Sequence, residues 1–544
     1  MQGTTAMSKR NYLLAPLAGL GIFIVVALLY GPYVGSPSIF DDVYFFLEPQ
    51  KYVDSLSWSG LFDRRWVSNA TLALTYRLWG AEHGAYHIGN LLIHGLTAFS
   101  LFLLIRDLLA HERDGSANLP AFTAAMLFAL HPVAAFAVGY IVERSIVLAG
   151  LFSIWMWIAV HRGVADGRKS WLLLSAAFYF LAVFSKEHAV AALPVALLVA
   201  WNAANGEMRK TLSSLALPLP LWMVTAAAIV LRLQGIIGAA YEPLLGEMGA
   251  EFPHTVDYLL RSVLNQSGLF FKYMLFWLVP NETWMAIDLR VPFPPTWFAW
   301  PWVLGMLAFA AYGGLTAIAL WRGWLPRLAG IGLIAPWLLF LTMFSAVQYQ
   351  EAFVLYRSYY WALPGALLVA FLLSKIPQRA QVTALLVVGL VCFGASWSRL
   401  QTFSHPVLLW DEAVSRLDGR DDLPGAYRIY HNRGIAYANM GGLYLAHALL
   451  DYNKVVQLNP SYPYVYNDRG AAYFELGDYA QALSDFNYAL DLKPAYLRPH
   501  LGRGLTLLKL GRYEEGMADL AHACTFGIGC NRYHDELAKI AKPV

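Results

Sequence analysis

The sequence predicts an all-α protein with two parts, a polytopic membrane domain over residues 1–400 and an array of helical repeats over residues 409–544. Of the 544 residues, 58% are hydrophobic and only 14% are charged, and the mean hydropathy is +0.46. This balance is typical of chains with many membrane-spanning helices. After residue 409 the long apolar runs stop, and similar segments return about every 34 residues. The net charge of +3 does not indicate nucleic-acid binding.

The first apolar run covers residues 13–30 and follows Lys9 and Arg10. It is long enough to cross a bilayer and shows no small-residue cleavage site, so we expect a retained first helix. Ten further spans are expected, near residues 88–110, 119–138, 145–161, 171–184, 189–201, 213–233, 297–321, 328–347, 358–374 and 382–398. The membrane domain therefore has about eleven expected spans.

Basic residues in every second loop set the expected orientation, because such residues favour the cytoplasmic face. They are Arg106, Arg113, Arg162, Arg168, Lys169, Arg209, Lys210, Arg322, Arg327, Lys375 and Arg379, together with Lys9 and Arg10. Segment 259–280 would place the later basic loops outside if it crossed the membrane. We therefore expect it to be an amphipathic or re-entrant segment on the outer side. The repeat array then also lies outside.

A second set of basic residues falls on the outer side, where the same rule disfavours them. The set is Arg64, Arg65, Arg144, Lys186, Arg232, Arg290 and Arg357. Single members can be solvated or can snorkel, but the set as a whole indicates a positively charged site at the outer membrane surface. Arginine matches the geometry of a phosphate group, so a lipid phosphate is the expected ligand.

Two adjacent carboxylates, Asp41 and Asp42, follow the first helix on the same outer side. Ionisable groups at a membrane surface are functional candidates because holding them there costs free energy. The alternative is a helix N-cap followed by an acidic first turn, which aspartate often supplies. The outer cations favour the functional interpretation.

The tail contains three similar helical pairs. NRGIAYANMGG at 432–442 returns at 468–483 and at 502–517, and HALLDYNKVVQLNP at 447–460 returns at 481–494. Small residues recur at Gly434, Gly470 and Gly504, where two helices can pack closely. This pattern resembles the tetratricopeptide (TPR) repeat, which forms solenoids that bind peptides or protein surfaces; a purely structural cap is the alternative. About two extra residues near Gly441 predict a longer turn in the first pair.

Cysteine usage adds one expectation about the end of the array. Cys524 and Cys530 frame a short loop on the outer side, where an oxidising compartment favours a disulfide. A metal site with His522 and His534 is the weaker alternative, because two cysteines alone are poor ligands. Cys392 lies in the last expected span and is interpreted as a packed hydrophobe.

The first 200 residues carry an ordered series of segments, FDDVYFF (40–46), YHIGNLLIHGL (86–96), LFALHPVAAFAVGYIVERSIVLAG (127–150) and FSKEHAV (184–190). In this order they resemble the protein O-mannosyltransferases that combine a multi-spanning domain with TPR repeats, and their bacterial relatives, all of the GT-C glycosyltransferase superfamily. Weaker matches follow at 272–289 and 355–365. The resemblance implies a polyprenyl-phosphate-linked sugar donor and transfer on the extracytoplasmic face.

The resemblance also implies site residues. The catalytic carboxylate would be Asp41 or Asp42, and the donor phosphate would meet Arg357, Arg144, Lys186, Arg64 and Arg65. Other site candidates are His87, Asn90, His131, Glu143 and Glu187. The chain departs from the family at Asn69-Ala70, where an Arg-Pro pair is common, and at Ile146 and Leu355, where acidic residues are common. The resemblance therefore does not identify the donor sugar as mannose.

Transfer from a lipid phosphate needs a base for the acceptor hydroxyl and cations for the departing phosphate. An inverting enzyme needs nothing more, so no metal ligand is assigned, although a divalent metal at the acidic pair is an alternative to some of the cations. Three histidines of the membrane domain, His87, His94 and His131, also have structural interpretations. His94 is expected to be a packing residue, and His131 is either a site residue or a helix cap.

The leading hypothesis is thus a membrane glycosyltransferase that modifies a protein acceptor bound by the TPR repeats. One alternative uses the same fold and donor to modify lipopolysaccharide or another envelope glycan. Another is a non-enzymatic assembly scaffold or transporter, although the charges gather at one face rather than at the midplane. Compact loops favour a bacterial inner membrane with periplasmic repeats, and the endoplasmic reticulum membrane with lumenal repeats is the alternative.

Overall fold

The computed structural model of the chain describes residues 9–40, 42–47, 49–57, 60, 63–112, 117–235, 237–239, 255–526, 530–531 and 534–535. Over these residues the regular structure is helical, with no strand. The chain divides into two compact units, one of residues 1–287 and 291–405 and the other of residues 288–290 and 406–544. The main boundary between the two units falls after residue 405.

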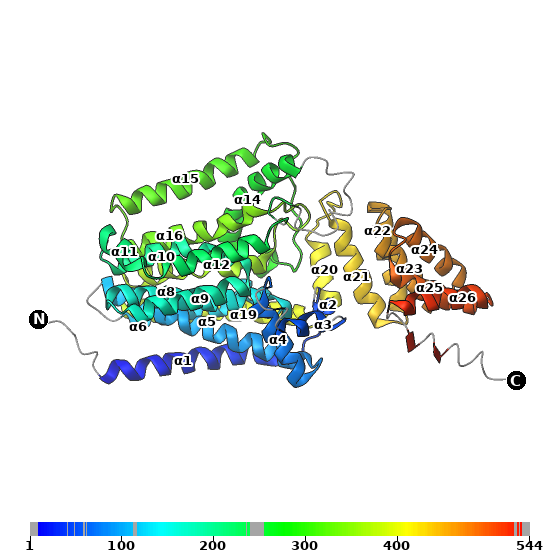
Figure 1. Cartoon of the computed structure of the whole chain (residues 1–544), viewed down its shortest axis with the longest axis horizontal. Coiled ribbons are helices and arrows are strands. Elements are labelled where there is room, and N and C mark those ends of the chain that lie inside the picture. The colour runs from blue at the N-terminus through cyan, green and yellow to red at the C-terminus, as the bar shows by residue number, and fades with distance from the viewer. Residues whose placement is uncertain are drawn as a thin grey trace, which may run out of the picture. The chain divides into compact units, whose positions relative to one another are not determined.

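The first unit is a bundle of long apolar helices that run side by side (Figure 1). Its members are α1 (Lys9–Tyr30), α4 (Trp66–Trp79), α5 (His83–Glu112), α6 (Asn118–Leu130), α7 (Pro132–Val138), α8 (Arg144–Ala165), α9 (Lys169–Ser185), α10 (Ala192–Ala203), α11 (Met208–Leu215), α12 (Leu219–Arg232), α14 (Thr255–Leu278), α15 (Trp302–Trp321), α16 (Arg327–Phe340), α17 (Ser358–Ala362), α18 (Gly365–Leu373) and α19 (Gln378–Phe403). Short helices α2 (Asp42–Leu47) and α3 (Gln50–Val53) follow α1.

Six of the described helices are long and apolar enough to cross a membrane, or eight if the bent pairs α6–α7 and α11–α12 each count as one span. The pairs bend by 62° and 67°. The remaining expected spans correspond to shorter apolar segments, namely α9, the segment Glu187–Ala203 and the interrupted pair α17–α18. The expected helices are therefore present, whereas length and composition alone support fewer full spans than eleven.

Segment 259–280 is part of α14, a continuous helix of 24 residues. A re-entrant segment would have to turn back within its length, so that alternative is wrong, and an amphipathic helix remains. Its buried residues include four polar ones, Ser262, Asn265, Gln266 and Ser267, all nearly inaccessible. On its other side Gly268 meets Gly305 of α15, where a Cβ added to Gly305 would lie 2.9 Å from the Gly268 Cα. Such close backbone contact through small residues is common between helices in membranes.

The second unit consists of α20 (Pro406–Ser415) followed by three helical pairs (Figure 1). The pairs are α21 (Ala426–Met440) with α22 (Tyr444–Leu458), α23 (Pro463–Glu475) with α24 (Tyr479–Leu492), and α25 (Leu497–Lys509) with α26 (Tyr513–Thr525). Close packing needs glycine at the predicted positions, since a Cβ on Gly434 would lie 2.6 Å from the Tyr452 ring.

The expectation of a longer turn in the first pair is wrong. Three residues separate the helices in each of the three pairs. The extra residues instead extend the helices, because α21 and α22 have 15 residues each whereas α23 and α24 have 13 and 14. A helix can lengthen by one residue without changing the turn that follows it.

Candidate functional site

Asp42 begins α2 and is completely buried. Its two carboxylate oxygens accept the backbone N–H groups of Ile141 at 3.1 Å and Val142 at 2.9 Å. These residues form the short helix η4 (Ile141–Glu143), whose first amides have no partners within the helix. Asp42 therefore ties the segment after α1 to the turn before α8. Asp41 lies outside the described residues.

Arg144 and Asn90 form a buried group of hydrogen bonds next to this turn. The Arg144 Nε donates to Asn90 Oδ1 at 2.8 Å, and its Nη atoms donate to the Thr71 carbonyl, the Thr75 hydroxyl and the Tyr86 carbonyl at 3.0–3.1 Å. The Asn90 amide in turn donates to carbonyls of residues 138, 140 and 141 at 3.2–3.3 Å. All three guanidinium nitrogens of Arg144 thus donate to acceptors within the protein, so these contacts give Arg144 a structural role.

Lys186 and Glu143 form a buried ion pair with a 3.1 Å separation between Lys186 Nζ and Glu143 Oε2. The two side chains are 2% and 7% exposed. Lys186 Nζ also lies 3.3 Å from the Ser145 hydroxyl and 6.0 Å from the centre of the Tyr356 ring. The pair joins η4 to the segment after α9.

Arg65 and Glu187 form a bidentate pair with distances of 2.9 and 2.6 Å. Burial by itself would raise the pKa of Glu187, but the charge and hydrogen bonds of Arg65 outweigh it and hold that pKa well below its usual value. The next residue, His188, lies near Glu187 and near three cations, Lys186, Arg65 and Arg357.

Arg357 ends the short helix η8 (Leu355–Arg357) and is held by residues of its own loop. Its Nη1 donates to Gln348 Oε1 at 2.5 Å and to the Glu351 carbonyl at 2.8 Å, and Nη2 lies 3.8 Å from the Glu351 carboxylate. Glu351 lies six residues before Arg357 in the sequence.

The polar face of α14 supports this loop. Gln266 Nε2 donates to the Ala352 carbonyl at 2.7 Å, the Ser262 hydroxyl accepts from the Gln348 N–H at 3.0 Å, and the Tyr273 hydroxyl accepts from the Val354 N–H at 2.8 Å. The amide and hydroxyl residues spaced three to seven apart in an otherwise apolar helix were the available sequence signal for this role.

Aromatic rings connect these parts. The Phe40 ring contacts Tyr140 at 6.2 Å between centroids, and Tyr140 contacts Tyr356 at 5.7 Å. Tyr356 in turn lies beside Lys186 and Arg357. Four segments far apart in sequence thus meet at one end of the first unit, namely residues 36–40 with Asp42, 140–145, 186–188 and 348–357, and Arg65 joins them through its pair with Glu187. We call this arrangement the loop cluster.

Other predicted site residues have different surroundings. His87 Nε2 donates to the Ser36 carbonyl at 3.2 Å, next to the loop cluster. His131 ends α6 and caps α7, with its Nδ1 accepting the Val133 N–H at 3.3 Å and its ring stacked on Trp277. His94 is bonded through both ring nitrogens, to Tyr359 and Ala129, as the packing interpretation expects.

Three of the seven outer basic residues are not part of the loop cluster. Arg64 is exposed, and Arg232 pairs with Asp63 at the surface at 3.4 Å. Arg290 belongs to the second unit, where it pairs with Asp288. Within the described ranges no group of three or more His, Cys, Asp or Glu side chains could hold a metal ion.

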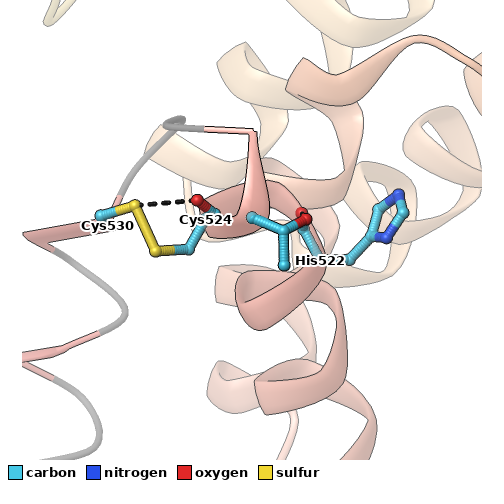
Figure 2. Close-up of a disulfide and its surroundings, with 4 residues drawn as sticks. His522, Cys524 and Cys530 are labelled. Atoms are coloured by element: carbon cyan, nitrogen blue, oxygen red, sulfur yellow. Dashed lines mark hydrogen bonds between the residues drawn. A yellow bond between two sulfur atoms is a disulfide. The ribbon is translucent and has the colours of Figure 1, made fainter.

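In the second unit, Cys524 and Cys530 form the expected disulfide, and the Cys530 sulfur also lies 3.1 Å from the Cys524 carbonyl oxygen (Figure 2). The His522 ring points away from the two sulfurs (Figure 2). The metal alternative therefore does not hold for this pair. Cys392 is buried and free.

Each helical pair repeats one polar interaction. An arginine on its first helix makes a bidentate pair with an aspartate on its second helix and also donates to a side chain on the preceding helix. The sets are Arg433 with Asp451 and Asp411, Arg469 with Asp485 and Asn453, and Arg503 with Asp519 and Asn487. Because α20 supplies Asp411, it stands where a preceding second helix would. The arginine directly before each repeat glycine was the signal in the sequence.

The middle pair also has an open hollow of about 410 Å³. It is lined by Tyr466 and Arg469 of α23 and by Ser484, Asp485, Asn487, Tyr488 and Asp491 of α24. The two tyrosine rings lie 4.5 Å apart, and Tyr488 is 44% exposed. Aromatic rings beside hydrogen-bonding groups are suited to binding a polypeptide segment.

Comparison with known families identifies the repeats. A tetratricopeptide repeat pattern matches residues 463–496, and a second TPR pattern matches residues 445–477. No curated protein matches the chain. A solved structure of MamA (AMB-1) matches with 17% identity over 40% of this chain and 91% of that chain, at a TM-score of 0.19. The chain therefore carries C-terminal TPR repeats, a class of module that generally mediates binding to other proteins.

Proposed function

We propose that the protein is a membrane glycosyltransferase that moves a sugar from a polyprenyl-phosphate-linked donor to a protein acceptor on the extracytoplasmic face. The observation that carries the proposal is the loop cluster, in which Arg357, Lys186 and Arg65 meet the segment that leads to the acidic pair. These segments are also the ones through which the chain resembles GT-C enzymes.

In the proposed reaction the acceptor hydroxyl oxygen attacks the anomeric carbon of the donor sugar. The bond between that carbon and the phosphate oxygen breaks, and the lipid phosphate leaves with the bonding electrons. A carboxylate takes the hydroxyl proton, and cations stabilise the charge that develops on the phosphate. One displacement inverts the anomeric centre.

The contacts of Asp42 indicate different roles for the two aspartates of the acidic pair. The Asp42 oxygens accept three backbone N–H groups, those of Ile39, Ile141 and Val142, and these hydrogen bonds fix the direction of the carboxylate. Asp42 is therefore proposed as the positioning residue for the η4 turn, and Asp41 as the base. Arg357 and Lys186 are the proposed phosphate ligands, while the buried contacts of Arg144 favour a supporting role.

The proposal requires a membrane, and the ends of α15 support one. Large aromatic side chains lie exposed at one end, with Trp297, Phe298 and Trp300 at 50–68%, and at the other, with Trp321 and Trp324 at 78% and 71%. The intervening helix of 20 residues is about 30 Å long, which matches the hydrocarbon core of a bilayer. Aromatic residues gather at both interfaces of membrane helices. A bacterial inner membrane with periplasmic repeats is the proposed location.

The TPR repeats are proposed to bind the protein acceptor, with the hollow around Tyr466 and Tyr488 as the contact. This distinguishes the proposal from modification of lipopolysaccharide or another envelope glycan, for which a protein-binding array has no evident use.

A membrane scaffold is the second candidate, because one observation favours it. Each of the three cluster cations already has a carboxylate within 4 Å, Arg65 with Glu187, Lys186 with Glu143 and Arg357 with Glu351. Pairs of this kind can serve stability alone, whereas a transferase must let a phosphate compete with the carboxylate.

Purified protein supplied with polyprenyl-phosphate sugars and candidate acceptor proteins tests the two candidates. The transferase proposal expects sugar transfer by the natural chain and its loss in Asp41→Asn, where the base is removed and the shape is kept. A scaffold would release no lipid phosphate from any donor, and its partner binding would be unaffected by Asp41→Asn.

A further inference from the structure

The end of the first unit opposite the loop cluster holds a second group of polar residues, of which His161 and Asn202 are buried. His111 lies at the end of α5, His161 at the end of α8 and Asn202 at the end of α10, and these helices pack against one another. The two histidine rings lie 5.4 Å apart. Arg327, at the start of α16, donates from its Nε to Asn202 Oδ1 at 3.1 Å. We call these four residues, with Lys210 of α11, the basic-end niche.

Three atoms in the niche make no hydrogen bond among the described residues, namely His111 Nε2, His161 Nδ1 and Asn202 Nδ2. The His111 ring itself also interacts with the Asn205 side chain and the Asn202 backbone. Asn202 is completely buried, and His161 is 5% exposed. Buried polar atoms almost always meet a partner, so three on adjoining helices point to a polar group that binds between them. Asn202 Nδ2 can only donate, and a neutral imidazole can place its proton on the unpaired nitrogen.

The charges around the niche indicate what kind of chemical group would bind there. Arg327 and Lys210 both act electrostatically on His111. The nearby acid Asp107 is already shared between Arg106 and Arg162 at 2.7–2.8 Å, and Glu112 accepts the Leu328 N–H at 3.0 Å. Arg327 also interacts with Glu112, so Lys210 and the unpaired donors remain for a further group, whereas the carboxylates are engaged. An acceptor of several hydrogen bonds with negative charge fits this arrangement.

We propose that the basic-end niche binds a phosphate group, either the headgroup of an anionic lipid or a free phosphate. The short basic loops mark this end as the cytoplasmic one, and basic pockets between membrane helices on that side are sites for anionic headgroups. The inference is independent of sugar transfer, because it uses no residue of the loop cluster.

The test is a thermal-unfolding titration of the full-length protein in detergent. Short-chain phosphatidylglycerol, phosphatidylcholine and inorganic phosphate are added separately, and the concentration giving half of the maximal rise in Tm is measured for each. Lys210→Gln removes an exposed cation of the niche, and Asn202→Leu removes a buried donor. Arg322→Gln is the matched control, since it removes an exposed cation at the same end on the peripheral helix α15.

Phosphatidylglycerol should raise the Tm of the natural chain, and each niche variant should need about tenfold more of it, because each loses one hydrogen bond to a charged group. The control should respond like the natural chain. A response to phosphatidylglycerol alone assigns the niche to a lipid headgroup, and an equal response to inorganic phosphate assigns it to free phosphate. No response in the natural chain, or equal responses in Lys210→Gln and Arg322→Gln, would overturn the proposal. Lys210→Gln keeps the test valid if Asn202→Leu does not fold.

Discussion

The substitution Asp42→Asn separates positioning from catalysis within the acidic pair. In the natural chain both Asp42 oxygens are buried and accept backbone amides, those of Ile141 and Val142. Asparagine has one acceptor oxygen, so one amide loses its partner and faces an NH₂ group instead. A hydrogen bond to a charged group contributes about 1.5–3 kcal/mol, and an unsatisfied buried donor costs a similar amount. We therefore expect a loss of about 2–3 kcal/mol in the free energy of unfolding.

The loss should appear as a Tm several degrees lower in detergent, measured by intrinsic fluorescence. Asp63→Asn is the control, because Asp63 is 57% exposed and pairs with Arg232 only at the surface. Asp41→Asn should keep the natural Tm while sugar transfer falls by about a hundredfold or more, as loss of a general base predicts. An unchanged Tm in Asp42→Asn together with abolished transfer would refute the positioning role and make Asp42 the base.

Three further predictions follow from the contacts. Arg357→Ala should raise the donor concentration needed for half-maximal transfer at least tenfold and leave the acceptor dependence within about twofold; an equal change in both would refute phosphate binding by Arg357. Arg65→Gln should lower the Tm, and the decrease should be largest above about pH 5. In the folded natural chain the pKa of Glu187 lies below its usual value of 4.5, which stabilises the fold above that pH. This stabilisation is lost as the pH falls towards the folded-state pKa. A Tm difference that stays constant between pH 3.5 and 7 would contradict that linkage. Tyr488→Ala should reduce modification of the protein acceptor about tenfold without changing donor hydrolysis. Tyr513 is also exposed but lies outside the hollow, so Tyr513→Ala should change neither activity. A loss of donor hydrolysis in Tyr488→Ala would be inconsistent with acceptor binding at the hollow.

The sequence was sufficient for the features that depend on local spacing. The TPR helices follow from a repeat of about 34 residues with glycine at fixed positions, and the disulfide follows from two cysteines six residues apart. The apolar runs likewise correspond to helices. These features need only contacts between near neighbours, which periodicity reports directly.

The partners of the site cations could not be predicted in the same way. Lys186 and Glu187 are adjacent, yet they pair with Glu143 and Arg65, at separations of 43 and 122 residues. The packing of helices decides such pairs, and one sequence holds no record of it. Asp42 shows the same limit, because its carboxylate binds amides about 100 residues away. The polar face of α14 was visible in the sequence but was interpreted as a membrane-surface feature rather than as the support for Arg357.

Intact-mass spectrometry of envelope proteins, from cells with and without this gene, tests the central claim most directly. If the protein transfers sugar to other proteins, some envelope proteins should lose mass increments equal to whole sugar residues when the gene is absent. The natural chain should restore those increments, and a chain carrying Asp41→Asn should not. Identical protein masses in the two cell types, or changes confined to lipopolysaccharide, would contradict transfer of a sugar to a protein acceptor.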